Sequence, residues 1–374
     1  MPDVKETIGG DASGRFEAVR RAFAEAFGAG EEIGAACAAV LDGKPIVDLW
    51  GGRAAPRGDA PWTEETVAPV HSSSKAVAAL MLARVVEAGA LDYDAPVAEY
   101  WPDFAQNGKD DVTVAQTLSH QAGLCGFPTE IDPMEWLDWD ALCARLAAMP
   151  PLWDPGAQSG YHPRTFGYLA GEIFRRATGG DLADAYAADF PGLAFAFAPG
   201  RLAGAPPIAE MRKPSAPPAL GPLNPYKEAA FLKPWSGPPM RADLRDHVNP
   251  GASGVGSARA LAWIMHAFAT GSGADGATLL SRRTLDAARK ERTAGEDLVL
   301  PFRLSYGAGV MRNAGAKLFG PNENAFGHYG AGGSCVVADP DHGFGFAYVT
   351  NKMSSLLIDD PRPLRLLAAL YSAL

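Results

Sequence analysis

The sequence is poor in cysteine and has no long apolar run, and both absences exclude classes of protein. Four cysteines occur in 374 residues, at 37, 125, 143 and 335, and no two of them form a Cys-x-x-Cys pair. This excludes zinc ribbons and thioredoxin-type redox sites, and cysteines this sparse are typical of buried residues in a reducing compartment. No segment approaches the roughly 20 apolar residues that span a bilayer, and the N-terminus lacks a signal-peptide stretch. We therefore expect a cytoplasmic protein that does not enter a membrane.

Basic residues are also in deficit, and several common catalytic motifs are missing. The chain has 33 Lys and Arg against 43 Asp and Glu, a formal net charge of -10. This balance gives no electrostatic reason to bind nucleic acid or an anionic membrane, so a small-molecule partner is expected. The absence of Gly-x-Ser-x-Gly disfavours the α/β-hydrolase fold. No His-Glu-x-x-His occurs and the seven histidines are dispersed, so neither a metal nor another cofactor is expected.

What is present is a pattern with strands at both ends of the chain and helices in its middle. Strands are predicted at 33–41, 45–50, 67–70, 305–311, 334–338 and 344–350, the first two paired around the Asp42-Gly43 turn. Helices are predicted at 14–28, 72–88, 113–119, 139–149, 165–178, 257–269 and 363–374. We interpret 1–75 and 245–374 as one discontinuous α/β domain and 76–244 as a mostly helical domain. Within the second domain, the Pro-rich stretch 190–240 is expected to be extended surface chain that covers a cleft.

A Ser-x-x-Lys motif stands where the predicted strand 67–70 runs into a helix. Ser72 and Lys75 are three residues apart and therefore share one face of a helix, so the hydroxyl and the amine can meet. The start of the helix also offers free N–H groups and a positive dipole to a developing oxyanion. Burial in the apolar run AVAALMLARVV would lower the lysine pKa and make it a base. From the spacing alone, a serine cap followed by an exposed lysine is an equally good interpretation. Ser73 and Ser74 lack the spacing and are expected to cap or pack.

Longer segments around this motif carry a family resemblance. They are HSSSKAVAALMLARVVEAGALDYDAPVAEYWPDF with TVAQTLSHQAGL, then YHPRTFGYLAGEIFRRATG, then FGHYGAGGSCVVADPDHGFGFAYVTNKM. In this order they resemble the serine β-lactamase and penicillin-binding-protein-like superfamily, specifically its class C-like esterase branch of family VIII-type carboxylesterases. The resemblance covers nearly the whole chain and is weakest at 190–240. Four segments in the right order are far more specific than one four-residue motif.

The resemblance implies a fold and a set of roles. The fold is a mixed α/β (α+β), class C β-lactamase-like one, with an antiparallel sheet flanked by terminal helices and an all-helical domain beside it. Ser72 would attack the acyl carbon, Lys75 would take its proton, and Tyr161 would carry protons for the leaving group and the attacking water. A phenol with a pKa near 10 would need a cationic partner, and Lys75 is the candidate. The backbone N–H groups of Ser72 and Ala331 would form the oxyanion hole.

Two departures from the family pattern bear on the substrate. Pro163 stands where β-lactam-active members carry the Asn of Tyr-x-Asn, and His328-Tyr329-Gly330 stands where they carry Lys-Thr-Gly. We expect these three residues to bind substrate, with His328 donating a hydrogen bond or tuning Tyr161, or else serving as a structural histidine. Loss of the amide and the second lysine weakens the case for a β-lactam. The expected activity is therefore hydrolysis of carboxylic esters with small to medium acyl groups, through an acyl-enzyme on Ser72.

Three alternatives remain open at this point. A β-lactamase or D-amino-acid peptidase would act on an amide with the same residues. An acyltransferase would share every catalytic residue and pass the acyl group to a small alcohol. A non-catalytic relative that binds cell-wall-like peptides belongs to another class, and the intact Ser72, Lys75 and Tyr161 argue against it because a binding module needs no deprotonated lysine.

Overall fold

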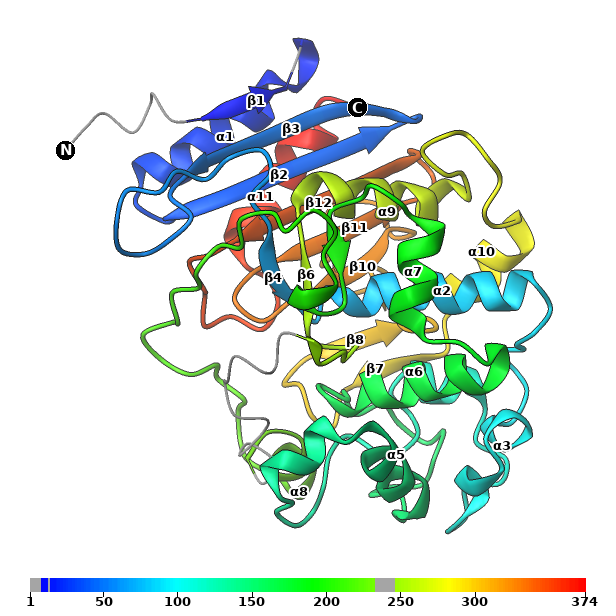
Figure 1. Ribbon diagram of the computed structural model, residues 1–374. Coiled ribbons are helices and arrows are strands. Elements are labelled where there is room, and N and C mark those ends of the chain that lie inside the picture. The colour runs from blue at the N-terminus through cyan, green and yellow to red at the C-terminus, as the bar shows by residue number, and fades with distance from the viewer. Residues whose placement is uncertain (1–7, 13, 233–245) are drawn as a thin grey trace.

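A nine-stranded antiparallel sheet forms the centre of the protein (Figure 1). The computed structural model describes residues 8–12, 14–232 and 246–374. In spatial order the strands are β1 (Gly9–Asp11), β3 (Lys44–Gly52), β2 (Gly34–Leu41), β12 (Phe344–Thr350), β11 (Cys335–Asp339), β10 (Phe326–Tyr329), β9 (Met311–Arg312), β8 (Arg303–Tyr306) and β7 (Thr293–Glu296). Strand β2 from the N-terminal part pairs with β12 from the C-terminal part. The two ends of the chain therefore build one sheet, as the sequence predicted.

The β2–β3 hairpin turns at the predicted Asp-Gly pair. Leu41 pairs with Lys44, which leaves a two-residue loop. Both loop residues have positive φ, 49° at Asp42 and 71° at Gly43. This is the backbone that a two-residue turn needs to match the twist of its strands, and Asp-Gly adopts it at low cost.

Side-chain size alternates along the central strands and sets how closely helices approach the sheet. On one face, Phe346 and Tyr348 of β12 pack with the core under α1 (Glu17–Gly28) and α11 (Pro361–Tyr371). On the other face, Ala36 and Ala347 pack with the core around α9 (Ala258–Thr270). A Cβ at Gly345 would lie within 2.3 Å of the α9 backbone, so only glycine fits there. Successive residues of a strand face opposite sides of the sheet. Strand β12 therefore presents large side chains to α1 and α11 and small ones to α9.

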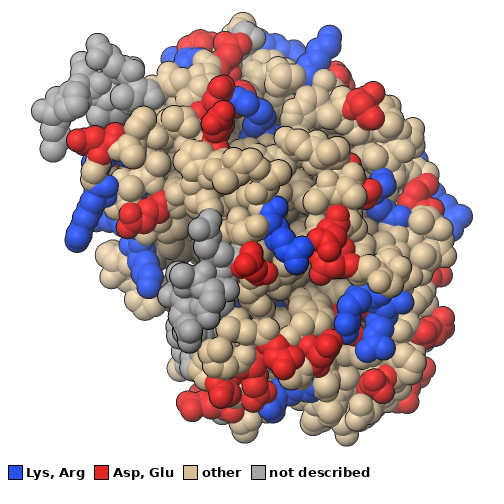
Figure 2. All heavy atoms as spheres, in the orientation of Figure 1, with Lys and Arg blue, Asp and Glu red and all other residues tan. Residues whose placement is uncertain are grey.

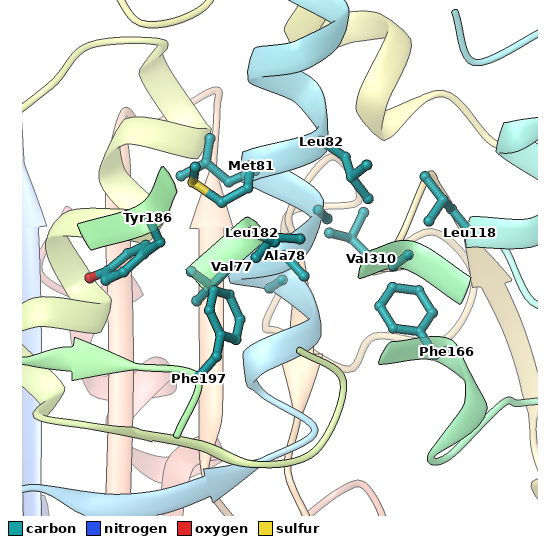
Figure 3. Close-up of a cluster of buried hydrophobic side chains, with 14 of the residues drawn as sticks. Val77, Ala78, Met81, Leu82, Leu118, Phe166, Leu182, Tyr186, Phe197 and Val310 are labelled. Carbon is teal, nitrogen blue, oxygen red and sulfur yellow. The ribbon is translucent and has the colours of Figure 1, made fainter. Parts of the chain in front are cut away.

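Helix α2 (Ser74–Glu87) is buried along most of its length, which explains why it is apolar on every side. Figure 3 shows its side chains Val77 and Met81 on the side of Leu182, Tyr186 and Phe197. The opposite side of α2 faces Leu118, Phe166 and Val310 (Figure 3). Around it lie α3 (Val97–Tyr100), α4 (Val114–Leu118), α5 (Trp139–Ala148), α6 (Thr165–Thr178), α7 (Leu182–Asp189) and α10 (Arg282–Arg289). Helices α4, α5 and α6 confirm the prediction, whereas α3, α7 and α10 were not predicted.

A second sheet corrects the prediction for the Pro-rich stretch. It has three strands in the order β4 (Ala68–His71), β6 (Gly254–Gly256), β5 (Phe195–Ala196). The short helix α8 (Pro225–Lys227) lies between β5 and β6 in the chain. Strand β5 lies inside 190–240, and residues 195–198 are buried rather than on the surface. Strand β5 lies at the edge of this sheet. This agrees with the high proline content of 190–240, because proline has no N–H to donate and an edge strand pairs on only one side. Residues 233–240 of the predicted cover lie outside the described residues.

The predicted strand 305–311 was also wrong in its extent. It is two short strands, β8 and β9, separated at residues 307–310, where Gly309 has a φ of 85°. Strand β7, at the edge of the large sheet, was not predicted. The division into domains at residues 75 and 245 stays a prediction. No helix in the described part of the chain is long and apolar enough to cross a membrane.

Candidate active site

The chain turns sharply where β4 meets α2, and Ser72 lies at that turn. His71 has a φ of 47°, in the left-handed region that costs a residue with a side chain about 1–3 kcal/mol. The turn is held by Ser74 Oγ, which donates to the His71 carbonyl at 2.6 Å. Ser73 Oγ lies 3.0 Å from Ser334 Oγ. Ser73 and Ser74 therefore serve packing, as predicted, and leave the half-buried Ser72 beside the start of the helix.

Lys75 is fully buried and its amine has three oxygen neighbours. Nζ lies 2.7 Å from the Gly251 carbonyl, 2.9 Å from the Pro163 carbonyl and 3.1 Å from Ser72 Oγ. A neutral amine has two N–H donors and one lone pair. The two carbonyls can accept only from N–H groups, so in the neutral state the lone pair is left for the Ser72 hydroxyl. This arrangement aims the amine as a base at the serine.

The surroundings of Lys75 favour that neutral state. Burial lowers its pKa well below the ordinary value, and the nearby Arg164 charge adds to the effect. Aromatic rings rather than carboxylates lie next to the amine: Nζ is 4.9 Å from the Tyr161 ring centre and 5.4 Å from that of Phe166. The Gly251 carbonyl is fixed in turn by Asn249, whose Oδ1 accepts from the Gly251 N–H at 3.0 Å.

Tyr161 stands beside Lys75, and its phenol is expected to stay protonated. Burial raises its pKa, a hydrogen bond with the Ser72 side chain opposes this, and the Asp297 charge raises it further. Asp297 also positions the residue, because its Oδ1 accepts from the Tyr161 N–H at 2.9 Å. The lowered pKa of Lys75 favours its neutral form. Its part as a cationic partner for Tyr161 therefore stays a prediction. The roles of Tyr161 as an acid and Lys75 as a base stay predictions.

Three buried histidines surround this pair, and the backbone fixes the proton positions on each ring. His162 Nδ1 donates to the Gly160 carbonyl at 2.6 Å, and its Nε2 accepts from the Leu124 N–H at 3.1 Å. His120 Nδ1 accepts from the His162 N–H at 3.1 Å, and its ring centre lies 4.8 Å from that of Tyr161. Burial and then the Lys75 charge lower the pKa of His328 to about 3. Burial likewise lowers the pKa of His120 and of His162, the latter to about 3. All three rings are therefore neutral at neutral pH.

His328 corrects one expectation. Its Nδ1 lies 2.6 Å from the Tyr329 carbonyl and must donate to it, because a carbonyl only accepts. The single N–H of the neutral ring is therefore at Nδ1 and donates to the backbone, so Nε2 carries only a lone pair. That Nε2 is buried and has no hydrogen-bond partner among the described residues. His328 can therefore accept a hydrogen bond in the site but cannot donate one.

Tyr329 points away from the site. Its hydroxyl donates to the Leu318 carbonyl at 2.7 Å, and its ring stacks on Phe319 at 5.5 Å. Adjacent residues on a strand face opposite sides, so a site that takes His328 cannot take the Tyr329 side chain. The Tyr329 side chain is thus engaged away from His328, and the part of Tyr329 in substrate binding stays a prediction.

Gly330 brings the end of β10 against the start of α2. A Cβ there would lie 2.1 Å from the Val70 carbonyl and 3.1 Å from Ser73 Oγ, so only glycine fits. Ala331 follows at the exposed start of the turn. Among the described residues no acceptor is found for the backbone N–H of Ser72 or Ala331. Both predicted oxyanion donors therefore lie at one junction with their N–H groups unused.

The similarity to known proteins extends over the whole of this architecture. A family model described as Beta-lactamase matches residues 19–370. The chain belongs to the Beta-lactamase family. The curated esterase/beta-lactamase LipL of Mycobacterium tuberculosis is 34% identical over 381 residues, which are 96% of this chain and 86% of LipL.

Several solved structures share the fold of this chain over nearly its whole length. A penicillin-binding protein homolog from Caulobacter crescentus is 47% identical with a TM-score of 0.93, over 98% of this chain and 100% of the homolog. A family VIII carboxylesterase is 35% identical with a TM-score of 0.89, with the same two coverages. A class C beta-lactamase mutant shares the fold, with 18% identity and a TM-score of 0.70 over 98% of this chain and 99% of the mutant. The predicted family and fold are confirmed.

Several residues of the site in this Beta-lactamase family member were missed by sequence reasoning. The Gly251 and Pro163 carbonyls act through backbone atoms, which leave no sign in the residue type. No motif in the sequence points to His120, whose ring lies beside that of Tyr161. Asp297 lies 136 residues from the Tyr161 that it holds. The described residues contain no group of three or more His, Cys, Asp or Glu side chains suited to a metal ion.

Proposed function

We propose that the protein is a serine carboxylesterase that forms an acyl-enzyme on Ser72. The observation that carries the proposal is the buried Lys75 amine, which lies within hydrogen-bond distance of two carbonyls and of the Ser72 hydroxyl. In its neutral form the amine donates to the two carbonyls and keeps its lone pair for Ser72. Ser72 Oγ attacks the acyl carbon while its proton passes to Lys75 Nζ. The N–H groups of Ser72 and Ala331 stabilise the oxyanion that forms.

Tyr161 completes the proton transfers in this proposal. Its hydroxyl gives a proton to the leaving alkoxide and regains one from Lys75, which returns to the neutral state. Water then attacks the acyl-enzyme by the same steps in reverse order, so the carboxylic acid leaves and Ser72 is restored. The raised pKa of Tyr161 supports the role of acid, because a phenol that stays protonated always has a proton to give.

The choice of ester over lactam rests on the residues that replace the family's Asn and Lys. Pro163 has no amide side chain, and its carbonyl is engaged by Lys75. His328 is neutral and offers only an acceptor, so it does not attract a substrate carboxylate. The likeness to a family VIII carboxylesterase supports ester hydrolysis. The preference for small to medium acyl groups is part of the proposal. β-Lactam hydrolysis is a second candidate activity, since LipL is named both an esterase and a beta-lactamase.

The proposal includes a small-molecule ester or amide substrate, no nucleic-acid partner and a cytoplasmic location. On the face in Figure 2, acidic and basic side chains are interspersed and the described residues form no extended basic surface. This supports the absence of a polyanionic partner. The four cysteines are buried free thiols, which supports a reducing compartment.

The test compares hydrolysis of p-nitrophenyl butyrate by the wild-type protein, Ser72→Ala and Ser73→Ala. We expect Ser72→Ala to lower kcat at least about 1,000-fold, the scale of nucleophile loss in serine hydrolases. Ser73→Ala is the matched control, because its hydroxyl bonds to Ser334, and it should keep most of the activity. Unchanged turnover in Ser72→Ala would contradict the proposal. A chromogenic cephalosporin measured in parallel compares the two candidate substrates by kcat/KM.

A further inference from the structure

The turn from Gly330 to Gly333 contains the Ala331 N–H. Its backbone is flexible because three of its four residues are glycine, so other groups must hold its conformation. Gly332 and Gly333 have φ values of 94° and 111°, which residues with side chains avoid. The Gly330 carbonyl accepts from the Gly333 N–H at 3.0 Å. In a trans peptide the carbonyl and the next N–H point in opposite directions, so this bond directs the Ala331 N–H away from the turn. Any tilt of the turn therefore moves the proposed oxyanion donor.

Arg362, at the start of α11, lies directly against the far end of this turn. Its Nη2 donates to the Gly332 carbonyl at 3.0 Å, and the Ser354 N–H donates to the same oxygen at 2.9 Å. A Cβ at Gly333 would lie 2.4 Å from Arg362 Nη2 and 2.5 Å from Asp360 Oδ2. The backbone of the turn thus rests on the Arg362–Asp360 ion pair with no space between them.

The guanidinium is itself fixed by further bonds. Nε and Nη2 donate to the Asp360 carboxylate at 3.0 and 2.7 Å, and Nη1 donates to Glu32 at 3.3 Å and to the Lys352 carbonyl at 2.8 Å. With the bond to the turn, five N–H groups have five acceptors, which is the full capacity of an arginine. Arg362 is 7% exposed, so water does not compete for these bonds. Glu32 is held in turn by Tyr348 and Thr350 of β12.

We propose that Arg362 is a positioning residue for the oxyanion hole, which holds the Gly330–Gly333 turn at the geometry that the Ala331 N–H needs. The inference rests on the proposed function, because it assigns Arg362 a part in the same reaction. Arg362 does not touch the substrate and acts through the Gly332 carbonyl. A planar fork suits this task, since one rigid group bonds the turn, Asp360 and Glu32 at once, whereas a lysine amine is a single point.

The experiment compares wild type, Arg362→Lys and Arg365→Gln on an ester and its sulfur analogue. Arg365 is the matched control, because it lies on the same helix and bonds to Glu31 rather than to the turn. The substrates are p-nitrophenyl butyrate and the thionoester in which sulfur replaces the carbonyl oxygen. Sulfur accepts hydrogen bonds weakly, so the thionoester gains less from the oxyanion donors. A fluorophosphonate that labels Ser72, counted by mass spectrometry, gives the fraction of folded, active protein.

We expect Arg362→Lys to lower kcat on the ester about 10- to 100-fold per labelled site, the scale of a displaced or lost oxyanion donor. KM should stay within about two-fold, since the loss concerns the transition state. The thionoester rate should fall less, so the ratio of ester to thionoester rates should drop. Arg365→Gln should leave kcat and the ratio unchanged.

Equal losses on both substrates, or a loss explained by fewer labelled sites, would overturn the inference and leave Arg362 with a purely structural role. If Arg362→Lys does not fold, Glu32→Gln repeats the test. It keeps an acceptor for Arg362 but removes one charge, and the ratio should drop in the same direction by a smaller factor. An unchanged ratio there also overturns the inference. Failure of the proposed function gives a different result, because wild type then hydrolyses the ester no faster than Ser72→Ala. The inference about Arg362 fails in that case too.

Discussion

Lys75 and Arg362 are both buried basic side chains that bond to two backbone carbonyls, but only Arg362 also has carboxylate partners. Lys75 contacts two carbonyls, a hydroxyl and two aromatic rings. Arg362 contacts two carboxylates, those of Asp360 and Glu32. Burial lowers the pKa of Lys75, and the charge of Arg164 adds to it. Burial acts in the same sense on Arg362, but Tyr348, Asp360 and Glu32 outweigh it and raise its pKa.

The difference shows that burial alone does not decide the charge of a group. A buried amine without a counter-ion loses its proton and becomes a base. A buried guanidinium between carboxylates stays charged and becomes a rigid support. The same apolar interior therefore supplies a reactive group on α2 and a fixed one on α11, and the neighbouring side chains determine which of the two results.

The largest expected effect comes from making Lys75 resemble Arg362. Lys75→Arg introduces a permanent positive charge and removes the base, because a guanidinium does not give up its proton at accessible pH. We expect kcat/KM for p-nitrophenyl butyrate to fall about 100- to 10,000-fold, the range for loss of a general base. Lys109→Arg is the control, since Lys109 is also a buried lysine that donates to two backbone carbonyls, and it should keep its activity. Full activity in Lys75→Arg would remove Lys75 from the mechanism.

The next effect concerns stability and comes from removing the cation at the other end. Arg362→Met leaves Glu32 and Asp360 buried without their partner, which should lower the free energy of unfolding by about 3–5 kcal/mol at neutral pH. Arg365→Met breaks a half-exposed pair and should cost about 0–1 kcal/mol. Urea denaturation measures both. Equal losses in the two variants would show that the buried network contributes no more than a surface pair.

The deficit of Arg362→Met should also depend on pH. Burial raises the pKa of Glu32, and loss of Arg362 raises it further because that charge opposes the shift. With a raised pKa the folded state binds more protons than the unfolded one, so stability falls as pH rises and recovers in acid. We therefore expect the difference in free energy of unfolding between wild type and Arg362→Met to narrow in acid. It should narrow as the pH falls through the raised pKa of Glu32 in the folded variant. A gap that widens in acid would contradict the assignment.

The sequence predicted the pairing of Ser72 with Lys75 but not that of Glu32 with Arg362. Ser72 and Lys75 are three residues apart, so helical geometry and the resemblance were enough to pair them. Glu32 and Arg362 are 330 residues apart, and only the pairing of β2 with β12 brings them together. The hairpin at Asp42-Gly43 was predictable because its signal is local. The short strands β7 and β9 were not, because neighbouring strands rather than their own composition define them.

The pH profile of catalysis tests the Lys75 environment directly. Because burial lowers the Lys75 pKa, the amine should be neutral at neutral pH, and kcat/KM should fall only in acid as it takes up a proton. The raised pKa of Tyr161 should delay any alkaline loss beyond about pH 10, the ordinary value for a phenol. Initial rates on ethyl butyrate, followed by titration of released acid, measure this without background hydrolysis of an activated ester. A rate that still climbs up to about pH 10 would show a lysine with its ordinary pKa.

The smallest expected effect separates the two causes of that lowered pKa. Arg164→Gln removes the positive charge that acts on Lys75 but leaves the amine buried. The pKa of Lys75 should therefore rise, and the acid limb of kcat/KM should move to higher pH. Because burial is the larger cause, the pH at which kcat/KM falls should remain well below the ordinary pKa of lysine. Arg176→Gln is the control, because Arg176 lies on α6, the helix that follows Arg164, and its guanidinium bonds to Glu172. It should leave the acid limb in place. A limb that does not move in Arg164→Gln would mean that burial alone makes Lys75 a base.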